Sequence, residues 1–362
     1  MKTLIYSIAK YINIAIAIAL LLAYISVYAD PERFWISAFF GLSYPFLLFI
    51  NLLFIIFWIY RKNKLLLISL IAVLIGWKQL RTFIQFPIRN KHFDTEKSFT
   101  VLSYNIRLFN LYNWSKDPQT PAKIFDFINA DQFDIICFQE FITQPSGELS
   151  EHNIQKNLGG KYYVHYGYSH KNSKTNYGIA TYSKYPIINR GTISFGNTSN
   201  MSIYTDVIIK KDTVRVFNNH LQSIRFNKNN YSFISNSKNL DEKTKFREAK
   251  DIIIRLREAF IKRATQSEIL SIHIKRSPYP VIVCGDFNDT PVSYTYNKMS
   301  NKLNDSFMEY GKGIGNTYRG NFPSFRIDFI LFSDDFKCVK FTVPKIKFSD
   351  HYPVAGRYVL KN

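Results

Sequence analysis

The sequence predicts an α/β domain in which two β-sheets pack face to face between helices, preceded by a helical membrane segment. Three observations support this prediction. The first 90 of the 362 residues are mostly apolar and contain only nine Lys or Arg and two Asp or Glu. Beyond them, short apolar runs typical of buried strands outnumber the helical patterns. Many of these runs end on a carboxylate, an amide or a histidine, which indicates a site where strands converge.

The N-terminal segment, residues 1–86, contains candidate membrane spans at residues 11–29, 34–60 and 65–84. The first two are long enough, because about 20 apolar residues cross a bilayer. A second span directly after the first argues against a cleaved signal peptide. The third stretch has 13 uncharged residues before Lys78. It spans only if the charged side chains at its end extend to the interface, and the alternative is an interfacial or re-entrant piece.

The charged residues around these spans predict their orientation. Lys2, Lys10 and the basic turn at residues 61–64 belong in the cytoplasm by the positive-inside rule, and the turn at residues 30–33 is net negative. Three spans would place the soluble domain on the extracytoplasmic side of a bacterial inner membrane, which is the favoured localisation. Two spans would leave it in the cytoplasm.

The net charge of +20 favours polyanionic partners, either anionic lipid head groups or nucleic acid.

A polar linker at residues 87–97 leads to a soluble domain at residues 98–362. Its apolar runs predict nine strands, at residues 99–104, 134–138, 177–182, 201–210, 213–219, 280–284, 327–332, 337–343 and 353–360.

Helices are expected at residues 120–130 and 240–273. In the first, Thr120 is predicted to be the N-cap and Pro121 the first helical residue. Residues 222–239, rich in Asn, Ser and Lys, are predicted to form a loop. The three cysteines indicate neither a disulfide framework nor a zinc site. Three further histidines match no motif and are expected on the surface or in loops: His152, His165 and His170.

Polar residues end or interrupt six of the apolar runs. Taken singly, each has an ordinary explanation as a turn residue, a solvated strand end or a structural histidine. Together, in this order, they indicate an active site: Asn105 after VLSY, Glu140 after DIICFQ, His220 after VRVFNN, Asp286 and Asn288 in VIVCGDFN, Asp328 in FRIDFIL, and Asp350 with His351 in FSDH.

The series SYN, FQE, NNHL, GDFN, RIDFIL and SDH resembles the endonuclease/exonuclease/phosphatase superfamily. This group includes pancreatic deoxyribonuclease, apurinic endonucleases, neutral sphingomyelinases and inositol polyphosphate 5-phosphatases. The resemblance covers residues 98–360 and implies a four-layer α/β sandwich. The segment at residues 176–187 (NYGIATYSKYPI) is also similar to the central strand of the family.

The resemblance implies hydrolysis of phosphate esters with Mg²⁺ or Mn²⁺. Glu140 resembles the principal metal ligand, Asn105 lies beside it, and Asp350 would complete the site directly or through water. Oxygen donors of this kind suit magnesium, which keeps several of its waters and needs only one or two carboxylates.

The same resemblance assigns catalytic roles to five further residues. Asp286 corresponds to the residue that orients or deprotonates the attacking water, and Asn288 to the one that holds this water or the phosphate. His220 and His351 correspond to the pair that contacts the phosphate and stabilises its developing charge. Asp328 corresponds to the carboxylate that pairs with His351 and fixes its tautomer.

Three functions remain open from the sequence. The first is a membrane-anchored hydrolase of lipid-like or small phosphodiesters (or phosphomonoesters), and the second is a nuclease acting on DNA or RNA. The third is a catalytically silent membrane scaffold or binding protein, which the complete motif set disfavours.

His220 separates the chain from apurinic endonucleases, which lack a histidine there. The sequence does not indicate the oligomeric state. Candidate substrate contacts are Tyr177, Arg319 and Arg326.

Overall fold

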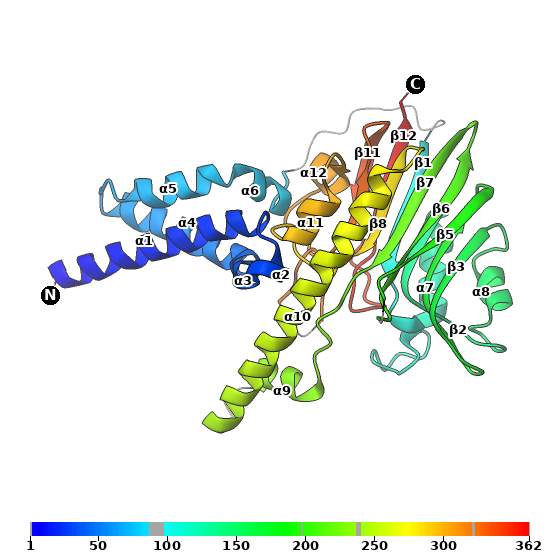
Figure 1. The fold of residues 1–362 in the computed structure, drawn as a ribbon, viewed down its shortest axis with the longest axis horizontal. Helices are drawn as coiled ribbons and strands as arrows, with labels where there is room; N and C mark the ends of the chain where they lie inside the picture. Colours follow the sequence, from blue (N-terminus) through cyan, green and yellow to red (C-terminus); the bar gives the residue numbers. More distant parts are fainter. Residues whose placement is uncertain (1, 87–97, 197, 237–239, 321–322, 362) are drawn as a thin grey trace.

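The computed structural model describes residues 2–86, 98–196, 198–236, 240–320 and 323–361. The predicted linker at residues 87–97 lies outside these ranges. A group of helices formed by the N-terminal residues stands against one side of a β-sandwich (Figure 1).

The N-terminal part forms six helices, four of which follow or precede a sharp bend. They are α1 (Lys2–Ser26), α2 (Pro31–Phe34), α3 (Ile36–Leu42), α4 (Tyr44–Tyr60), α5 (Leu66–Ile75) and α6 (Trp77–Phe83). Residues Tyr6–Ser26 of α1 are long and apolar enough to cross a membrane. The pairs α3/α4 and α5/α6 meet at 60° and 71°, and each pair is a further candidate span only if it counts as one bent span. The bends lie next to Pro45 and at Gly76, residue types that weaken a helix.

A buried polar network connects α1, α4 and α5. Asn13 Nδ2 donates to Ser69 Oγ (2.6 Å), and Ser69 Oγ donates to Asn51 Oδ1 (2.8 Å). Trp58 Nε1 donates to Asn13 Oδ1 (2.8 Å). The outward faces of these helices instead expose large apolar side chains such as Phe49. Polar contacts inside and apolar side chains outside are the pattern expected of helices in a bilayer.

Two six-stranded sheets form the sandwich, with the strand orders β11-β12-β1-β2-β4-β3 and β5-β6-β7-β8-β10-β9. Only the pairs β1/β2 and β7/β8 are parallel among the described ladders. The first sheet contains β1 (Ser98–Asn105), β2 (Ile135–Thr143), β3 (Tyr163–Lys171), β4 (Asn176–Ser183), β11 (Phe336–Thr342) and β12 (Val354–Leu360). The second contains β5 (Ile187–Ser194), β6 (Met201–Ile209), β7 (Asp212–His220), β8 (Val281–Asp286), β9 (Asn304–Asp305) and β10 (Asp328–Phe332).

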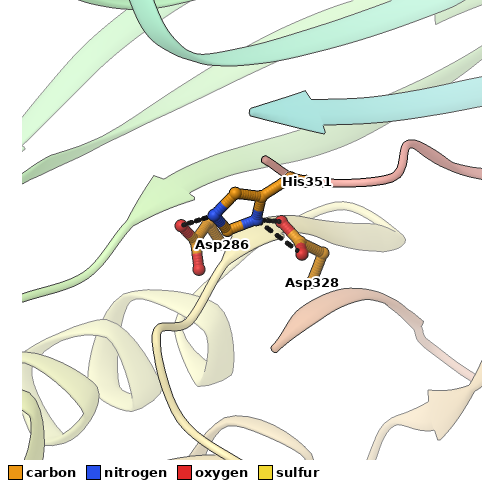
Figure 2. A group of neighbouring side chains, drawn as sticks. All are labelled: Asp286, Asp328 and His351. Atoms are coloured by element: carbon orange, nitrogen blue, oxygen red, sulfur yellow. Dashed lines mark hydrogen bonds and ion pairs between the residues drawn. The ribbon is translucent and has the colours of Figure 1, made fainter. Parts of the chain in front are cut away.

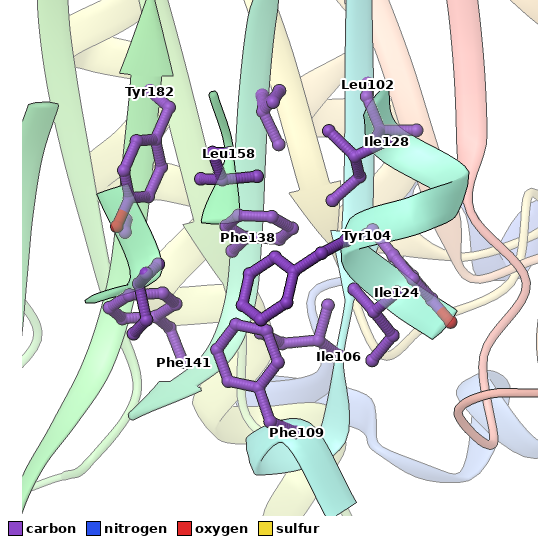
Figure 3. Packing of buried hydrophobic residues seen from close by; sticks show 14 of the residues in the cluster. Leu102, Tyr104, Ile106, Phe109, Ile124, Ile128, Phe138, Phe141, Leu158 and Tyr182 are labelled. Carbon is purple, nitrogen blue, oxygen red and sulfur yellow. The ribbon is translucent and has the colours of Figure 1, made fainter. Parts of the chain in front are cut away.

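Three apolar layers hold the sandwich together. Cys137, Cys284 and their neighbours fill the space between the two sheets. Aromatic residues such as Phe138 and Phe141 pack the first sheet against α7 (Thr120–Asp131) and α8 (Glu151–Asn157) (Figure 3). On the far side, α10 (Glu242–Lys275) and α11 (Tyr294–Met299) cover the second sheet. The other helices described in this domain are η1 (Arg107–Asn110), α9 (Lys228–Asn236) and α12 (Ser306–Tyr310). The order helix, sheet, sheet, helix confirms the predicted α/β sandwich.

Several local predictions are wrong. The expected loop at residues 222–239 contains α9. Thr120 lies inside α7, where its hydroxyl donates to the Asp117 carbonyl (2.7 Å), and the N-cap residue is Gln119. His165 was expected on the surface or in a loop, but it lies on β3 with its side chain buried between the two sheets. Its Nδ1 is 2.9 Å from Thr205 Oγ1 of the opposite sheet. Strands β3 and β5 were not predicted, because polar residues and glycine interrupt their apolar patterns.

The helical segment packs directly against the sandwich. Phe39 of α3 makes an edge-to-face contact with Phe260 of α10, with ring centroids 5.3 Å apart. Gly41 lies so close to the loop before α11 that a Cβ atom would be 2.4 Å from the Val292 carbonyl oxygen. Any side chain at position 41 would therefore push α3 away from the sandwich.

Candidate active site

The predicted polar residues gather at one edge of the sandwich, beyond the carboxyl ends of both parallel strand pairs. Asn105 ends β1, beside Gln139 of β2. His220 ends β7 beside Asp286, which ends β8. Asp328 begins β10 and lies opposite Asp286, because β10 runs antiparallel to β8. Parallel neighbours place their carboxyl ends together, so residues far apart in the sequence meet here.

A β-bulge aims Glu140 at this edge. The register of β2 against β4 shifts between Phe138 and Phe141, and Glu140 has a φ of +46°. A positive φ is unfavourable for a residue with a side chain, and bulges often redirect side chains next to active sites. Asn288, just after β8, also has a positive φ of +52°. Backbone strain of this kind is concentrated at functional sites.

Asp286 is the centre of the cluster and is almost completely buried. Its Oδ2 accepts from Asn105 Nδ2 (3.0 Å) and from Asn288 Nδ2 (3.2 Å), and its Oδ1 accepts from the Asn288 backbone N–H (2.8 Å). Burial raises the pKa of Asp286 to about 6, although the charge of His351 opposes this rise. A carboxylate with such a pKa can accept a proton near neutral pH.

His351 lies between two carboxylates, as Figure 2 shows. Its Nδ1 is 2.9 Å from Asp328 Oδ2, and its Nε2 is 3.8 Å from Asp286 Oδ2. Burial alone would lower the pKa of His351, but the charges of Asp328 and Asp286 raise it well above its usual value. The imidazole is therefore held as a cation with Nε2 directed at Asp286.

His220 presents an unsatisfied nitrogen to the same space. Its buried Nε2 has no hydrogen-bond partner among the described residues and is 3.9 Å from both Glu140 Oε1 and Asp286 Oδ2. Burial lowers the pKa of His220, and Asp286 partly offsets this effect. A buried polar group without a partner is costly, so this nitrogen indicates a bound group between the carboxylates.

Charge also indicates that the cluster binds a cation. Among the residues that the structure describes, four carboxylates (Glu140, Asp286, Asp328 and Asp350) contact two cationic partners, Arg107 and His351, and the third contact, His220, has a lowered pKa. Desolvation and the charge of Asp350 both raise the pKa of Glu140. An anionic phosphate would add to this excess of negative charge, whereas a divalent cation would neutralise it.

Two sets of side chains could hold such a cation. Ligand atoms of Asp286, Asp328 and His351 lie within 4.8 Å of one another. In this set, however, His351 Nδ1 and Asp328 already bind each other. The predicted set of Glu140, Asn105 and Asp350 offers oxygen donors that suit Mg²⁺ better. Asn105 directs Nδ2 at Glu140 (3.3 Å), so its amide would have to turn over to act as a ligand.

A pocket of about 260 Å³ opens onto the cluster. Glu140, Asp286, Asn288, Asp350 and His351 line it. The other three predicted residues of the metal and catalytic sets contact these lining residues directly: Asn105, His220 and Asp328.

The three predicted substrate contacts do not line this pocket. Arg326 is buried in an ion pair with Asp305 (2.8 Å) and donates to the Thr82 carbonyl, so the structure does not bring it to the pocket. Tyr177 contacts the Tyr112 hydroxyl (3.0 Å) outside the pocket. Arg319 lines a neighbouring groove instead.

Sequence reasoning missed several lining residues. Arg107, two positions after Asn105, lies 3.3 Å from Asp350 through its Nε and covers the Trp114 ring. Its place two residues after the SYN motif was the available signal. Leu42 of α3 also lines the pocket, and no sequence pattern connects it to residues so distant in the chain.

Comparisons with known proteins agree with this geometry. Residues 102–351 match the model of the Endonuclease/Exonuclease/phosphatase family, and residues 5–83 match a domain of unknown function (DUF8431). No curated protein matches the chain.

Three solved structures illustrate the shared fold. An endonuclease/exonuclease/phosphatase from Bacteroides vulgatus is 16% identical, with a TM-score of 0.54 over 73% of this chain and 99% of that chain. A family protein from Bacteroides thetaiotaomicron is 18% identical (TM-score 0.53, 73% and 98% covered). D. rerio TDP2, complexed with a single strand DNA product, is 14% identical (TM-score 0.52, 72% and 98% covered). On the evidence of the family match and of this shared architecture, the chain belongs to the endonuclease/exonuclease/phosphatase family.

Proposed function

We propose that the protein is a membrane-anchored, metal-dependent phosphoesterase that hydrolyses phosphodiester or phosphomonoester bonds by attack of water. The observation that carries this proposal is the arrangement around Asp286. A buried carboxylate with a raised pKa faces His220 Nε2 and His351 Nε2, with Glu140 beside them, at the mouth of a pocket.

In the proposed reaction, the oxygen of water forms a bond to phosphorus as the bond from phosphorus to the leaving oxygen breaks. Asp286 orients the water and accepts its proton, and Asn288 holds Asp286 in place through two hydrogen bonds. The cationic His351, fixed by Asp328, and the unpaired Nε2 of His220 donate to the phosphoryl oxygens. A divalent cation held by Glu140, Asp350 and Asn105 would supply charge neutralisation at the phosphate and at the leaving oxygen.

The proposed anchor consists of residues 1–86, and residues 98–362 form the catalytic domain. In Figure 1 the N-terminus lies at the end of the helices farthest from the sandwich. The basic turn at residues 61–64, which joins α4 to α5, lies at the same far end of these helices (Figure 1). Three crossings and a cytoplasmic N-terminus support an extracytoplasmic position for the catalytic domain.

Hydrolysis of nucleic acid is a second candidate, favoured by a different observation. Beside the pocket lies a groove lined by Arg107, Arg319, Lys347 and Trp114. Cationic side chains with an aromatic ring are typical of surfaces that bind single strands. The solved complex of D. rerio TDP2 with a DNA product shows that a protein of this fold can act on DNA.

The first test is hydrolysis of bis-p-nitrophenyl phosphate by the full-length protein in nanodiscs. We expect turnover with Mg²⁺ or Mn²⁺, none with EDTA, and a loss of about a thousandfold or more in kcat for Glu140→Gln, because a principal cation contact is removed. Glu148→Gln, a change of the same type at an exposed position, should leave the rate unchanged.

Turnover that persists in EDTA, or in Glu140→Gln, would contradict the metal-dependent mechanism. A folded protein that turns over neither this ester nor DNA nor phospholipid would favour the scaffold. Faster cleavage of DNA than of any lipid, with affinity falling steeply as salt rises, would favour the nuclease.

A further inference from the structure

The lining of the catalytic pocket combines two chemically different sets of side chains. The polar set includes the carboxylates and His351 of the active site, together with arginines such as Arg263. The other set, the apolar wall, comes from four separate parts of the chain: Leu42, Ile224, Phe226, Leu256, Phe260 and Ile327.

Part of this apolar wall belongs to the proposed membrane segment. Leu42 is the last residue of α3, and α3 continues into the apolar helix α4 after a single residue. Leu256 and Phe260 extend from α10 toward the same space, and Phe260 also contacts Phe39 one turn earlier in α3. The apolar wall is therefore continuous with helices whose outer faces are apolar.

An apolar wall beside a charged site is not explained by the chemistry at phosphorus. Water, a phosphate and a cation would bind to the polar set of lining residues alone. Apolar side chains that line a cavity stabilise a ligand only if the ligand buries apolar surface against them.

We propose that the pocket binds a phosphate ester that carries an apolar chain, as membrane phospholipids do, and that Leu42, Leu256 and Phe260 hold the part of this chain next to the phosphate. The membrane segment would then form one wall of the active site in addition to anchoring it. This proposal rests on the phosphoesterase function proposed above.

The size of the pocket limits what it encloses. At about 260 Å³, it is slightly smaller than typical ligand pockets of about 300–1,000 Å³. It can hold the phosphate and the first few carbons of a chain, so a longer chain must leave the pocket. We expect it to leave past Leu42, the lining residue that belongs to the N-terminal helices.

The cationic groove, lined by Arg107, Arg319 and Lys347, adjoins the pocket on a side away from the apolar residues of α3 and α10. It shares Arg107, Trp114 and Asp350 with the pocket but has none of the apolar residues of α3 or α10. A nucleic acid strand in that groove would leave the apolar wall uncovered. The wall therefore favours an amphiphile over nucleic acid.

The test uses the full-length protein in nanodiscs with a series of p-nitrophenyl phosphodiesters whose second substituent is methyl, propyl or pentyl. Burial of a methylene against the wall should raise kcat/KM about fourfold for each carbon added, until the pocket is filled. In Leu42→Ser the ratio of pentyl to methyl ester should fall about tenfold. Leu42→Trp, which fills the space beside the apolar wall, should reduce the same ratio. Because tryptophan keeps this position apolar, the variant serves as a second test if the serine variant does not fold.

The matched control is Leu52→Ser, the same change on the outer face of α4, where Leu52 is 40% exposed and remote from the pocket lining. It should keep the wild-type ratio, which shows that partitioning into the lipid does not produce the effect. A wild-type kcat/KM that is independent of chain length, or an equal loss of the ratio in Leu52→Ser, would contradict the proposal that the apolar wall binds the chain. Neither result would contradict the phosphoesterase activity. Faster cleavage of a single-stranded oligonucleotide than of any ester would also overturn the proposal. Failure of the wild type to hydrolyse even the methyl ester would instead contradict the proposed function itself.

Discussion

Two buried histidines of this protein show how neighbouring residues decide a charge. His351 contacts Asp328 and faces Asp286, and these carboxylates raise its pKa despite its burial. Within the described ranges, His165 has no carboxylate beside it and shares one hydrogen bond, with Thr205. Burial, aided by Arg190, lowers the pKa of His165 to about 4. One imidazole is therefore kept as a cation for the site and the other as a neutral link between the sheets.

His165 should make the protein sensitive to acid. Its pKa is lower in the folded state than in the unfolded state, so between about pH 6.5 and pH 4 the unfolded chain binds the extra proton more readily. The free energy of unfolding should fall across this window as the pH falls, by about 3 kcal/mol in total. His165→Gln keeps a polar partner for Thr205 without the titration, and its unfolding free energy should depend less on pH. Equal pH dependence of the two proteins in urea unfolding from pH 4 to 7.5 would contradict this account.

At the scale of elements, one buried arginine connects the N-terminal helices to the sandwich. Arg326, just before β10, pairs with Asp305 (2.8 Å) and donates to the Thr82 carbonyl (2.8 Å) at the end of α6. Its guanidinium also lies over the ring of Phe307, 4.4 Å from the centroid. A single side chain thus satisfies a helix end, a carboxylate and an aromatic face.

Arg326→Leu should reduce the free energy of unfolding by about 3–5 kcal/mol, because it leaves Asp305 buried without its cation. Arg319→Leu, the same change at an exposed arginine, should alter it by no more than about 0.5 kcal/mol. Chemical unfolding in detergent measures both. Equal, small effects would show that the pair contributes little to holding α6 against the sandwich.

At the scale of the whole molecule, three crossings would place the basic turn at residues 61–64 and the catalytic domain on opposite sides of the membrane. The three native cysteines are buried, so a membrane-impermeant maleimide should react only with an introduced, exposed cysteine. Lys174→Cys in the sandwich should label in intact spheroplasts, and Lys62→Cys only after permeabilisation, since both positions are exposed. Labelling of both from the same side would indicate two spans.

How much the sequence predicted depended on the distance over which each interaction acts. Apolar runs with polar ends, such as the one that closes on Glu140, predicted the strands, because burial in a sheet follows from the local pattern. The bends beside Pro45 and at Gly76 change direction within a span of uniform hydropathy, so the length of the apolar stretch did not reveal them. The burial of Arg326 and the position of Leu42 depend on segments that are distant in sequence, and no local pattern carries that information.

The strand order has a consequence for the synthesis of the protein. In the first sheet, β1 lies between β2 and β12, with Leu102 of β1 opposite Ala355 of β12. Asp350 and His351 come shortly before β12 in the sequence. A ribosome therefore releases these two residues of the site long after the apolar helices have emerged and become available for insertion. The proposed enzyme would gain activity only when β12 has joined β1, which would limit hydrolysis by nascent chains before they reach the membrane.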